Sequence, residues 1–460
     1  MFERSRKGER ALLLQPRWVS DSSSAKAGTE ELDEFSELAR SAGATVVGAL
    51  NARIDKPNPK FFVGSGKADE LKEQRAALDA DLILVNHTLS PVQERNLEKL
   101  TECRVVDRIG LILDIFAQRA RSHEGKLQVE LAQLKHMATR LVRGWTHLER
   151  QRGGAIGLRG PGETQLELDR RMLAGRVKQL TQRLEKVATQ RATARRSRQR
   201  NAVPVVSLVG YTNAGKSTLF NAVTGAGVYA ADQLFATLDP TLRRIEGLPC
   251  GPLILADTVG FIRDLPHDLV AAFKSTLAET RDADLLLHVV DAADPELDQN
   301  IEQVERVLAE IGAQDVPQVI VYNKLDKLID SAGLPRQARI ERIEGDSITR
   351  VWVSAVTGEG LPLLREALTG ALQRDRVHTW IALPHTAGRL RSRLIAAGFV
   401  AAERTVEGGW EVQLDAPRAL LEPLYGLPDG EGEWLRARLA ETDLLAAPGA
   451  APYNSAATAH

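Results

Sequence analysis

The chain has 460 residues, of which 43% are hydrophobic and 26% are charged, and it contains 36 glycines and 20 prolines. This length predicts about three domains, and the composition excludes a collagen-like, low-complexity or mainly disordered protein. The formal net charge of -1 gives no indication of binding to nucleic acid or to membranes.

Two cysteines, Cys103 and Cys250, are too few for a disulfide framework and lack the CxxC spacing of a metal site. Residues 1–20 carry arginine and glutamate without the apolar segment of a signal peptide, and the sequence has no apolar run of roughly 18 residues or more. These features predict a cytoplasmic protein without a membrane span.

Short apolar runs alternate with helical patterns at the start of the chain and predict an α/β domain with a mainly parallel sheet over residues 1–118. The expected strands are 11–14, 45–50, 61–63, 82–85 and 104–107, and the expected helices are 30–42, 68–77 and 90–100. The segment Gly64-Ser65-Gly66-Lys67 lacks the spacer and final Ser or Thr of a phosphate loop. We therefore expect a turn there, with a second nucleotide site as the alternative.

Residues 119–202 predict a basic antiparallel helical hairpin. Apolar residues recur in steps of four and three from Leu127 to Leu148 and again, with one Arg, from Leu173 to Ala194, as in a coiled coil. Five glycines and a proline in residues 150–163 break the two helices and predict a glycine-rich tip. Residues 119–200 hold 20 Lys and Arg against 7 Asp and Glu, a net charge of +13 that leaves -14 for the rest of the chain.

The rest of the chain predicts three further regions. Apolar strands alternate with helices over residues 203–375, as in a doubly wound sheet. Residues 376–445 predict a small α+β domain, and the Ala-rich residues 446–460 predict a disordered tail. The expected fold class is therefore α/β multidomain.

The segment Gly210–Ser217 has the GxxxxGK[ST] spacing of a phosphate loop and lies between an expected strand and an expected helix. In such a loop, backbone N–H groups surround the phosphates, the lysine reaches β and γ oxygens, and the final hydroxyl can bind Mg2+. The expected phosphate-binding residues are Gly210, Tyr211, Thr212, Asn213, Ala214, Gly215, Lys216, Ser217 and Thr218.

Asn323, Lys324 and Asp326 form an NKxD motif at the end of another expected strand. A carboxylate in this place accepts hydrogen bonds from guanine N1–H and its amino group. Adenine would leave the buried Asp326 unpaired, at a cost of about 1–3 kcal/mol or more for a charge. The motif predicts guanine, with Ser354 and Ala355 at the end of the next strand as further contacts.

Two segments are expected to sense the γ-phosphate. Asp257, Thr258, Val259 and Gly260 form DxxG, in which Asp257 can hold Mg2+ through water and the Gly260 N–H can bond the γ-phosphate. Phe235, Ala236 and Thr237 form the expected first switch. Thr237 is the candidate Mg2+ ligand beside Ser217, and Thr241 is its rival. Loss of the phosphate would release the segment that follows Gly260.

Two positions depart from the commonest GTPase chemistry. Phe261 stands where Ras-type GTPases place a water-orienting Gln, and a phenyl ring cannot orient water by hydrogen bonding. We expect slow turnover alone and completion of the site by a partner. Asn213 is a residue type found in GTPases that are activated by a monovalent cation, so we expect a K+ contact there.

Four segments resemble the HflX family of ribosome-associated GTPases, within the Obg-HflX superfamily. They are GYTNAGKS at 210–217, FATLDPT at 235–241, DTVGFI at 257–262 and GLRGPGETQLELDRR at 157–171. The resemblance extends over about residues 10–375, and the C-terminal domain carries less weight. It implies GTP hydrolysis with Mg2+, binding to the large (50S) ribosomal subunit, splitting of 70S ribosomes or their rescue under stress, and peripheral membrane association through ribosomes.

The charge of the hairpin supports a ribosomal partner independently, because RNA binding requires a cationic surface. The resemblance places the hairpin tip near the peptidyl-transferase centre of 23S rRNA. The candidate rRNA contacts are Arg150, Arg152, Gly153, Gly154 and Arg159.

Two other functions remain open from the residues alone. One is a signalling GTPase whose coiled coil makes protein contacts, and the other is an RNA-remodelling ATPase that uses Lys67. We expect a monomer that binds GTP and GDP.

Overall fold

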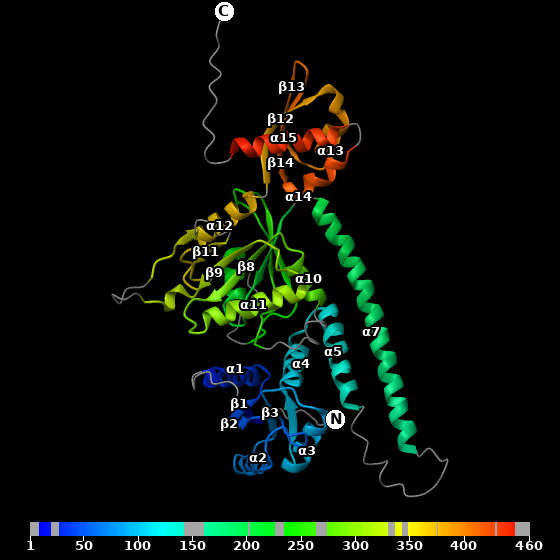
Figure 1. Cartoon of the computed structure of the whole chain (residues 1–460), viewed down its shortest axis with the longest axis vertical. Coiled ribbons are helices and arrows are strands. Elements are labelled where there is room, and N and C mark those ends of the chain that lie inside the picture. Colours follow the sequence, from blue (N-terminus) through cyan, green and yellow to red (C-terminus); the bar gives the residue numbers. More distant parts are fainter. Residues whose placement is uncertain are drawn as a thin grey trace, which may run out of the picture.

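The computed structural model describes residues 9–19, 27–141, 161–200, 203–225, 234–263, 274–329, 336–342, 348–374, 376–427 and 430–446. Figure 1 shows an N-terminal α/β unit, a long pair of helices, a central unit with a large sheet and a small C-terminal unit. The predicted α/β multidomain class is confirmed. None of the described helices is long and apolar enough to cross a lipid bilayer.

The N-terminal sheet is parallel and has the order β2-β1-β3-β4. Its two central strands, β1 and β3, are mostly buried, as expected for a parallel sheet with helices on its faces. The elements are β1 (Arg10–Trp18), α1 (Ala27–Ser41), β2 (Thr45–Ile54), α2 (Ser65–Ala77), β3 (Leu82–Val85), α3 (Pro91–Thr101), β4 (Arg104–Asp107) and α4 (Arg108–Arg119).

Two details differ from the sequence prediction. The strand expected at 61–63 is wrong, because the Asn58 side chain accepts the backbone N–H of Lys60 at 2.8 Å and closes a turn. Phe62 then lies in the left-handed region at φ 68° and stacks its ring on His87. Helix α4 was not among the expected elements, and Asp107 caps it by accepting the N–H of Gly110 at 2.8 Å.

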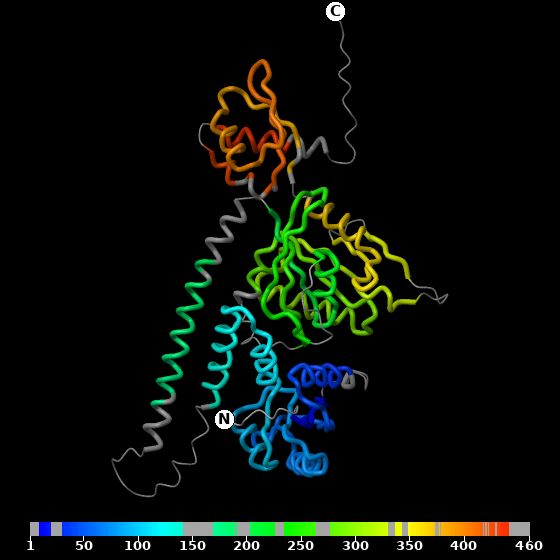
Figure 2. Tube along the Cα trace, turned by 180° about the vertical axis from the view of Figure 1, so that it is seen from behind, coloured from blue at the N-terminus to red at the C-terminus, as the bar shows by residue number. Residues whose placement is uncertain are grey.

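The two long helices are α5 (His123–Leu141) and α7 (Pro161–Arg200), and Figures 1 and 2 both show them side by side. They run antiparallel, because Leu127 and Leu131 enclose Leu180 while Glu130 forms an ion pair with Arg176 at 2.6 Å. The candidate rRNA contacts in the tip, Arg150, Arg152, Gly153, Gly154 and Arg159, lie outside the described residues.

The central sheet has seven strands in the order β10-β11-β9-β8-β5-β7-β6, and both edge strands are antiparallel. Strands β6 and β7 lie on one side of β5, and the later strands β8 to β11 lie on its other side. A ligand site is expected where the strand order reverses in this way, at the carboxyl ends of the central strands. The elements are β5 (Val205–Val209), α8 (Lys216–Thr224), β6 (Thr241–Ile245), β7 (Leu253–Asp257), α10 (Lys274–Arg281), β8 (Leu285–Asp291), α11 (Leu297–Ile311), β9 (Gln318–Asn323), η1 (Leu325–Lys327), β10 (Ile340–Arg342), β11 (Thr349–Trp352) and α12 (Leu361–Arg374).

The C-terminal unit is a three-stranded antiparallel sheet, in the order β12-β14-β13, with its own apolar core. The N-terminal and central units share a core instead, in which Phe116 of α4 meets Phe235 edge-on at 4.7 Å between ring centroids. The C-terminal elements are β12 (Arg376–Pro384), η2 (His385–Ala387), α13 (Gly388–Ala396), β13 (Val400–Val406), β14 (Gly409–Pro417), α14 (Arg418–Leu421), η3 (Glu422–Gly426) and α15 (Glu431–Ala446).

We predict that Leu180→Ala loosens the helix pair. Leu180 is fully buried between α5 and α7, so its truncation should lower the local opening free energy by about 2–5 kcal/mol. Native-state hydrogen exchange of the amides of both helices measures this loss. Leu168→Ala is the matched control on the exposed part of α7 and should change the value by less than about 0.5 kcal/mol. Equal exchange in both variants would contradict the prediction.

Candidate functional site

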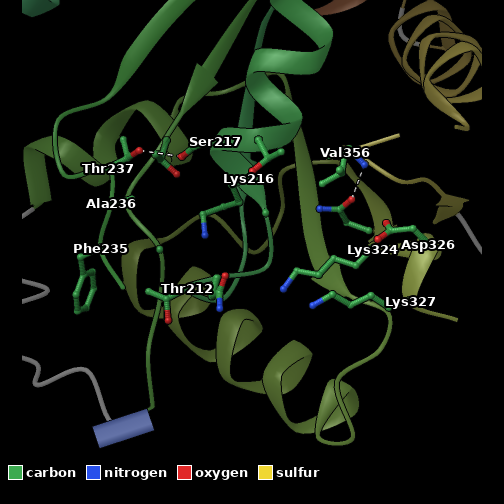
Figure 3. A pocket seen from close by; sticks show the side chains of 17 residues that line it. Thr212, Lys216, Ser217, Phe235, Ala236, Thr237, Lys324, Asp326, Lys327 and Val356 are labelled. Carbon is green, nitrogen blue, oxygen red and sulfur yellow. Dashed lines mark hydrogen bonds between the residues drawn. The ribbon is translucent and has the colours of Figure 1, made fainter. Parts of the chain in front are cut away.

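A cavity of about 250 Å³ lies at the carboxyl ends of the central strands. Figure 3 shows Ser217 and Thr237 together in one part of it, and Lys324, Asp326 and Val356 in another. The expected residues that line it are Thr212, Asn213, Gly215, Lys216, Ser217, Thr218, Phe235, Ala236, Thr237, Thr258, Gly260, Asn323, Lys324, Asp326 and Ala355. Gly210, Tyr211, Ala214, Asp257, Val259 and Ser354 were also expected in the site but do not line the cavity.

The phosphate loop has little room for side chains at two glycines. A Cβ on Gly210, which has φ +144°, would lie 2.1 Å from the carbonyl oxygen of Val289. A Cβ on Gly215, at φ +91°, would lie 2.2 Å from the amide nitrogen of Asn323. The chain can therefore turn tightly here and begin α8 at Lys216, which directs the N-terminus of that helix at the cavity.

Lys216 is the buried cation of the loop. Its ammonium group donates hydrogen bonds to the carbonyl oxygens of Gly210 at 3.0 Å and Tyr211 at 2.7 Å. Burial lowers the pKa of Lys216 to about 8, and the nearby charge of Asp257 opposes that shift. A polyanion in the cavity would restore the charged form.

Three oxygen ligands converge beside Lys216. The Asp257 carboxylate accepts hydrogen bonds from Ser217 at 2.7 Å and from Thr237 at 2.9 Å, and the two hydroxyls lie 2.9 Å apart. The second carboxylate oxygen of Asp257 is buried without a hydrogen-bond partner in the described part of the chain. Burial raises the pKa of Asp257. Hard oxygen donors around a buried carboxylate fit a Mg2+ ion.

The rival first-switch residue, Thr241, lies elsewhere. It begins the edge strand β6, pairs with Asp257 in the backbone ladder and does not line the cavity. Thr237 is therefore the threonine of this segment that shares the carboxylate with Ser217.

Asn323 connects the two ends of the cavity. Its amide group donates to the carbonyl of Ala214 at 2.9 Å and accepts the backbone N–H of Ala355 at 3.0 Å. Ser354 donates to Asp326 at 2.5 Å, and the ammonium of Lys324 pairs with Asp291 at 2.6 Å. Asn323 thus holds the phosphate loop and the expected base-binding residues in one frame.

Phe261 does not project into the cavity. Its ring is 1% exposed and belongs to the core that the two units share. Its backbone instead binds the phosphate loop, because its carbonyl accepts the N–H of Thr212 at 2.7 Å and its N–H donates to Gly210 at 3.1 Å. The second switch segment is therefore hydrogen-bonded directly to the loop.

Two residues that line the cavity were not expected from the sequence, and Tyr211, which was expected to bind phosphate, does not line it. Lys327 and Val356 line it without a motif to mark them. The Tyr211 side chain turns away, donates a hydrogen bond to Glu34 of α1 and accepts the N–H of Arg263 at 2.8 Å. Burial, and then the charge of Glu34, raise the pKa of Tyr211. Tyr211 therefore connects the phosphate loop to the N-terminal unit, and the sequence pattern gave no sign of this contact.

Three family models match the chain. They are described as GTP-binding GTPase N-terminal over residues 29–117, GTP-binding GTPase Middle Region over 119–198 and 50S ribosome-binding GTPase over 205–324. The GTPase HflX of Escherichia coli (strain K12) is 57% identical over 409 residues, which cover 89% of this chain and 93% of that protein. The chain belongs to the HflX GTPase family.

A second curated relative agrees with this membership, and a solved structure is also similar to the chain. The GTPase HflX of Magnetococcus marinus is 46% identical over 436 residues and covers 94% of this chain and 98% of that protein. A GTP-binding protein from Sulfolobus solfataricus, solved with GDP, is 26% identical, with a TM-score of 0.41 and coverage of 79% of this chain and 98% of that one.

The resemblance stated from the four motifs is confirmed, and this HflX-family member is a ribosome-associated GTPase. The signalling and ATPase alternatives are not favoured. Lys67, the residue required by the second of these, lies in the first turn of α2 and pairs with Glu70 at 2.8 Å.

We predict that nucleotide affinity falls as the pH rises above about 8, by up to roughly tenfold per pH unit. Lys216 loses its proton near this pH in the free protein, whereas bound phosphates keep it charged, so binding takes up a proton. Calorimetry of GDP binding at pH 7 and pH 9, in buffers of different ionisation enthalpy, measures both effects. Lys216→Gln should bind weakly at both values and abolish this proton uptake. A pH-independent affinity in the unmodified chain would contradict the prediction.

Proposed function

We propose that GTP and Mg2+ bind in the cavity beside Lys216 and that hydrolysis there switches the protein on the large ribosomal subunit. The observation that carries this proposal is the convergence of Ser217, Thr237 and Asp257 within hydrogen-bond distance of one another. Ser217 and Thr237 would bind Mg2+ directly, and Asp257 through water. The metal ion supplies positive charge beside the β and γ oxygens.

The proposed reaction is attack of water on the γ-phosphorus. The bond from that phosphorus to the β–γ bridging oxygen breaks, and GDP and inorganic phosphate are the products. Lys216 would stabilise charge on the β and γ oxygens, and the N–H of Gly260 would bond the γ-phosphate. Backbone N–H groups of residues 210–218 would surround the phosphates.

The base would lie at the other end of the cavity. Asp326 would accept hydrogen bonds from guanine N1–H and its amino group, with Lys324 beside it. Asn323 would hold this end in register with the phosphate loop, and the backbone of Ser354 and Ala355 would contact the guanine carbonyl. The hydrogen bonds that already join these residues support this assignment.

The ribosome would complete the catalytic site. Phe261 is buried and its ring cannot orient water, so the chain supplies no group at the position after DxxG for this task. We propose that the large subunit provides or rearranges such a group, and that turnover without it is slow.

We propose 23S rRNA as the contact surface of the helical hairpin, residues 119–202. The described part of α7 exposes a row of cations, including Lys178, Arg183 and Lys186, and phosphates are the natural partner of such a surface. In this proposal the hairpin and the N-terminal domain, residues 1–118, act together on the 50S subunit to split or rescue 70S ribosomes. The GTPase domain, residues 203–375, controls them, and residues 376–445 form the C-terminal domain.

We predict that purified large subunits raise GTP turnover well above that of the free protein, because they supply what Phe261 lacks. Phosphate release under multiple turnover, with and without large subunits, measures this. Small subunits at the same concentration are the control for non-specific RNA binding. Identical turnover with and without large subunits would rule out completion of the site by the ribosome.

We also predict a K+ requirement that depends on Asn213, which lies exposed at the rim of the cavity with φ 61°. An amide oxygen in the phosphate loop can help to coordinate a monovalent cation beside the phosphates. Turnover should be faster in K+ than in Na+ at equal ionic strength, and Asn213→Ala should remove the difference. Equal rates in the two salts would eliminate this contact.

A further inference from the structure

Residues 234–239, which include the expected first switch Phe235–Thr237 and are called the first switch segment below, contact the N-terminal unit and the hairpin at three points. The N–H of Leu234 donates to Ser41 of α1 at 3.1 Å, and Phe235 packs against Phe116 of α4. Asp239 then reaches the start of α5. The segment that contains Thr237 is thus held against the part of the molecule that the proposed function places on the ribosome.

Asp239, from another domain, binds the residue that caps α5 and the residue before it. One carboxylate oxygen accepts the N–H groups of Arg121 and Ser122, both at 2.7 Å, and the other accepts the Ser122 hydroxyl at 2.5 Å. The Ser122 oxygen in turn accepts the N–H of Gly125 at 2.8 Å. A carboxylate at a helix N-terminus also interacts favourably with the helix dipole.

The two segments approach so closely that a larger residue at position 125 would displace the Asp239 carboxylate. A Cβ on Gly125 would lie 2.2 Å from a carboxylate oxygen of Asp239, although Gly125 itself lies within a helix, where glycine is unfavourable. The sequence therefore has a residue of low helix propensity at the position where α5 contacts the first switch segment. This supports close contact as a requirement at Gly125.

Asp239 lies close to the nucleotide end of the same segment. Thr237, two residues earlier, shares the Asp257 carboxylate with Ser217. Two residues span at most about 7 Å of chain, and Leu238 between them is buried in the shared core. If Thr237 moves when the γ-phosphate is lost, the short chain between the two residues can absorb little of that movement. Asp239 is therefore expected to move as well.

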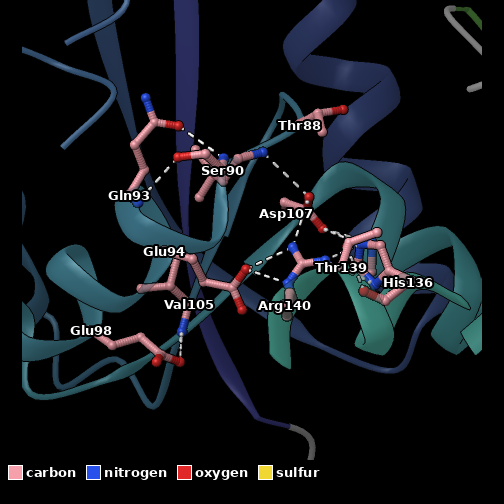
Figure 4. Close-up of polar contacts among 12 residues, drawn as sticks. Thr88, Ser90, Gln93, Glu94, Glu98, Val105, Asp107, His136, Thr139 and Arg140 are labelled. Atoms are coloured by element: carbon pink, nitrogen blue, oxygen red, sulfur yellow. Dashed lines mark hydrogen bonds and ion pairs between the residues drawn. The ribbon is translucent and has the colours of Figure 1, made fainter. Parts of the chain in front are cut away.

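The far end of α5 is fixed to the N-terminal unit, as Figure 4 shows. Arg140 pairs with Glu94 at 2.6 Å and with Asp107 at 3.0 Å, and His136 lies 3.7 Å from Asp107. Burial alone would raise the pKa of Asp107, but hydrogen bonding to His136 and the charge of Arg140 lower it, so the carboxylate stays charged. Helix α5 thus joins the switch to the N-terminal unit as a strut attached at both ends.

We propose that Asp239 is a positioning residue that transmits the state of the γ-phosphate from Thr237 to the cap of α5, and so to the hairpin and the N-terminal domain. This inference rests on the proposed function, since it assumes that those parts engage the large subunit. Asp239 touches neither the nucleotide nor the metal in this proposal. Its partners are the cap groups of Arg121 and Ser122.

The test compares Asp239→Ala with Ser122→Ala and with the double variant. Each single change should lower the stimulation of GTP turnover by large subunits roughly tenfold, within the range of known coupling between sites. Ser122→Ala should leave the affinity for GDP unchanged, because Ser122 is not among the residues that line the cavity. The double variant should lose no more than either single one, because both remove the same connection.

Two further variants separate coupling from loss of stability. Asp239→Asn keeps an oxygen that accepts the backbone N–H groups, so it should retain most of the stimulation. Ser90→Ala removes the capping box of α3, a comparable cap away from the switch, and should leave stimulation intact. Additive losses in the double variant, equal loss in Asp239→Asn and Asp239→Ala, or equal loss in Ser90→Ala would overturn the proposal.

A readout without ribosomes keeps this inference distinct from the proposed function. Hydrogen exchange of the amides of residues 121–126 should differ between the GDP-bound protein and the protein bound to a non-hydrolysable GTP analogue. Asp239→Ala should abolish that difference. If large subunits fail to stimulate the unmodified protein, the proposed function fails. If the exchange difference is absent in the unmodified protein or persists in Asp239→Ala, the inference fails.

Discussion

The buried carboxylate of Asp257 holds the first switch segment to the phosphate loop. It is fully buried at the end of β7, where an ionised group is costly unless cations and hydrogen bonds surround it. Lys216, Ser217 and Thr237 supply part of that environment. The second carboxylate oxygen has no partner among the described residues, and further positive charge would be most favourable there. The same electrostatic requirement therefore brings Ser217 and Thr237 to one carboxylate, which is where we propose that Mg2+ binds.

The N-terminal unit contributes directly to the conformation of the nucleotide site. Arg108 of α4 donates to Glu34 at 2.6 Å and to the carbonyl of Arg263 at 2.9 Å, and Glu34 accepts the hydroxyl of Tyr211. Arg263 also pairs with Glu296. This network joins α1, the phosphate loop and the second switch segment. Its charges are partly buried, so each is stabilised by a partner of opposite charge or by a hydrogen bond. The second switch is held through Arg108 and Tyr211, whereas the first is held through Phe235 and Asp239.

Local chemistry made much of this arrangement predictable from the sequence. Motif spacing marked the loop, Asp257 and Asn323, because phosphate and base binding impose fixed residue types at strand ends. Periodicity located both long helices. It did not show where the two helices pack, because the buried contact is made by only a few residues, such as Leu127, Leu131 and Leu180. The strand at 61–63 failed because one side chain, Asn58, closes a turn that alternation of apolar residues does not reveal.

Contacts between distant segments could not be predicted in the same way. Asp239 was visible only as a neighbour of Thr237, and nothing local indicates that Ser122, 117 residues away, would receive its carboxylate. Gly125 carried a weak signal, since a glycine in the first turn of a helix is unfavourable without a reason in packing. Such pairs depend on how the units are docked, which neither periodicity nor motif spacing encodes.

The helix pair has two connections to the nucleotide site, and they differ in kind. Helix α7 leads through the chain into β5, a central strand that ends at the phosphate loop and is fixed by pairing on both sides. Helix α5 is connected through Asp239, which belongs to a switch segment. The other end of α5 is fixed to the N-terminal unit through Arg140, so a shift at Asp239 would be passed on to that unit. Because α7 packs on α5 at Leu180 and has 40 residues, or about 60 Å of helix, the same shift would also reach α7. The proposed coupling therefore needs no large rearrangement within the GTPase domain.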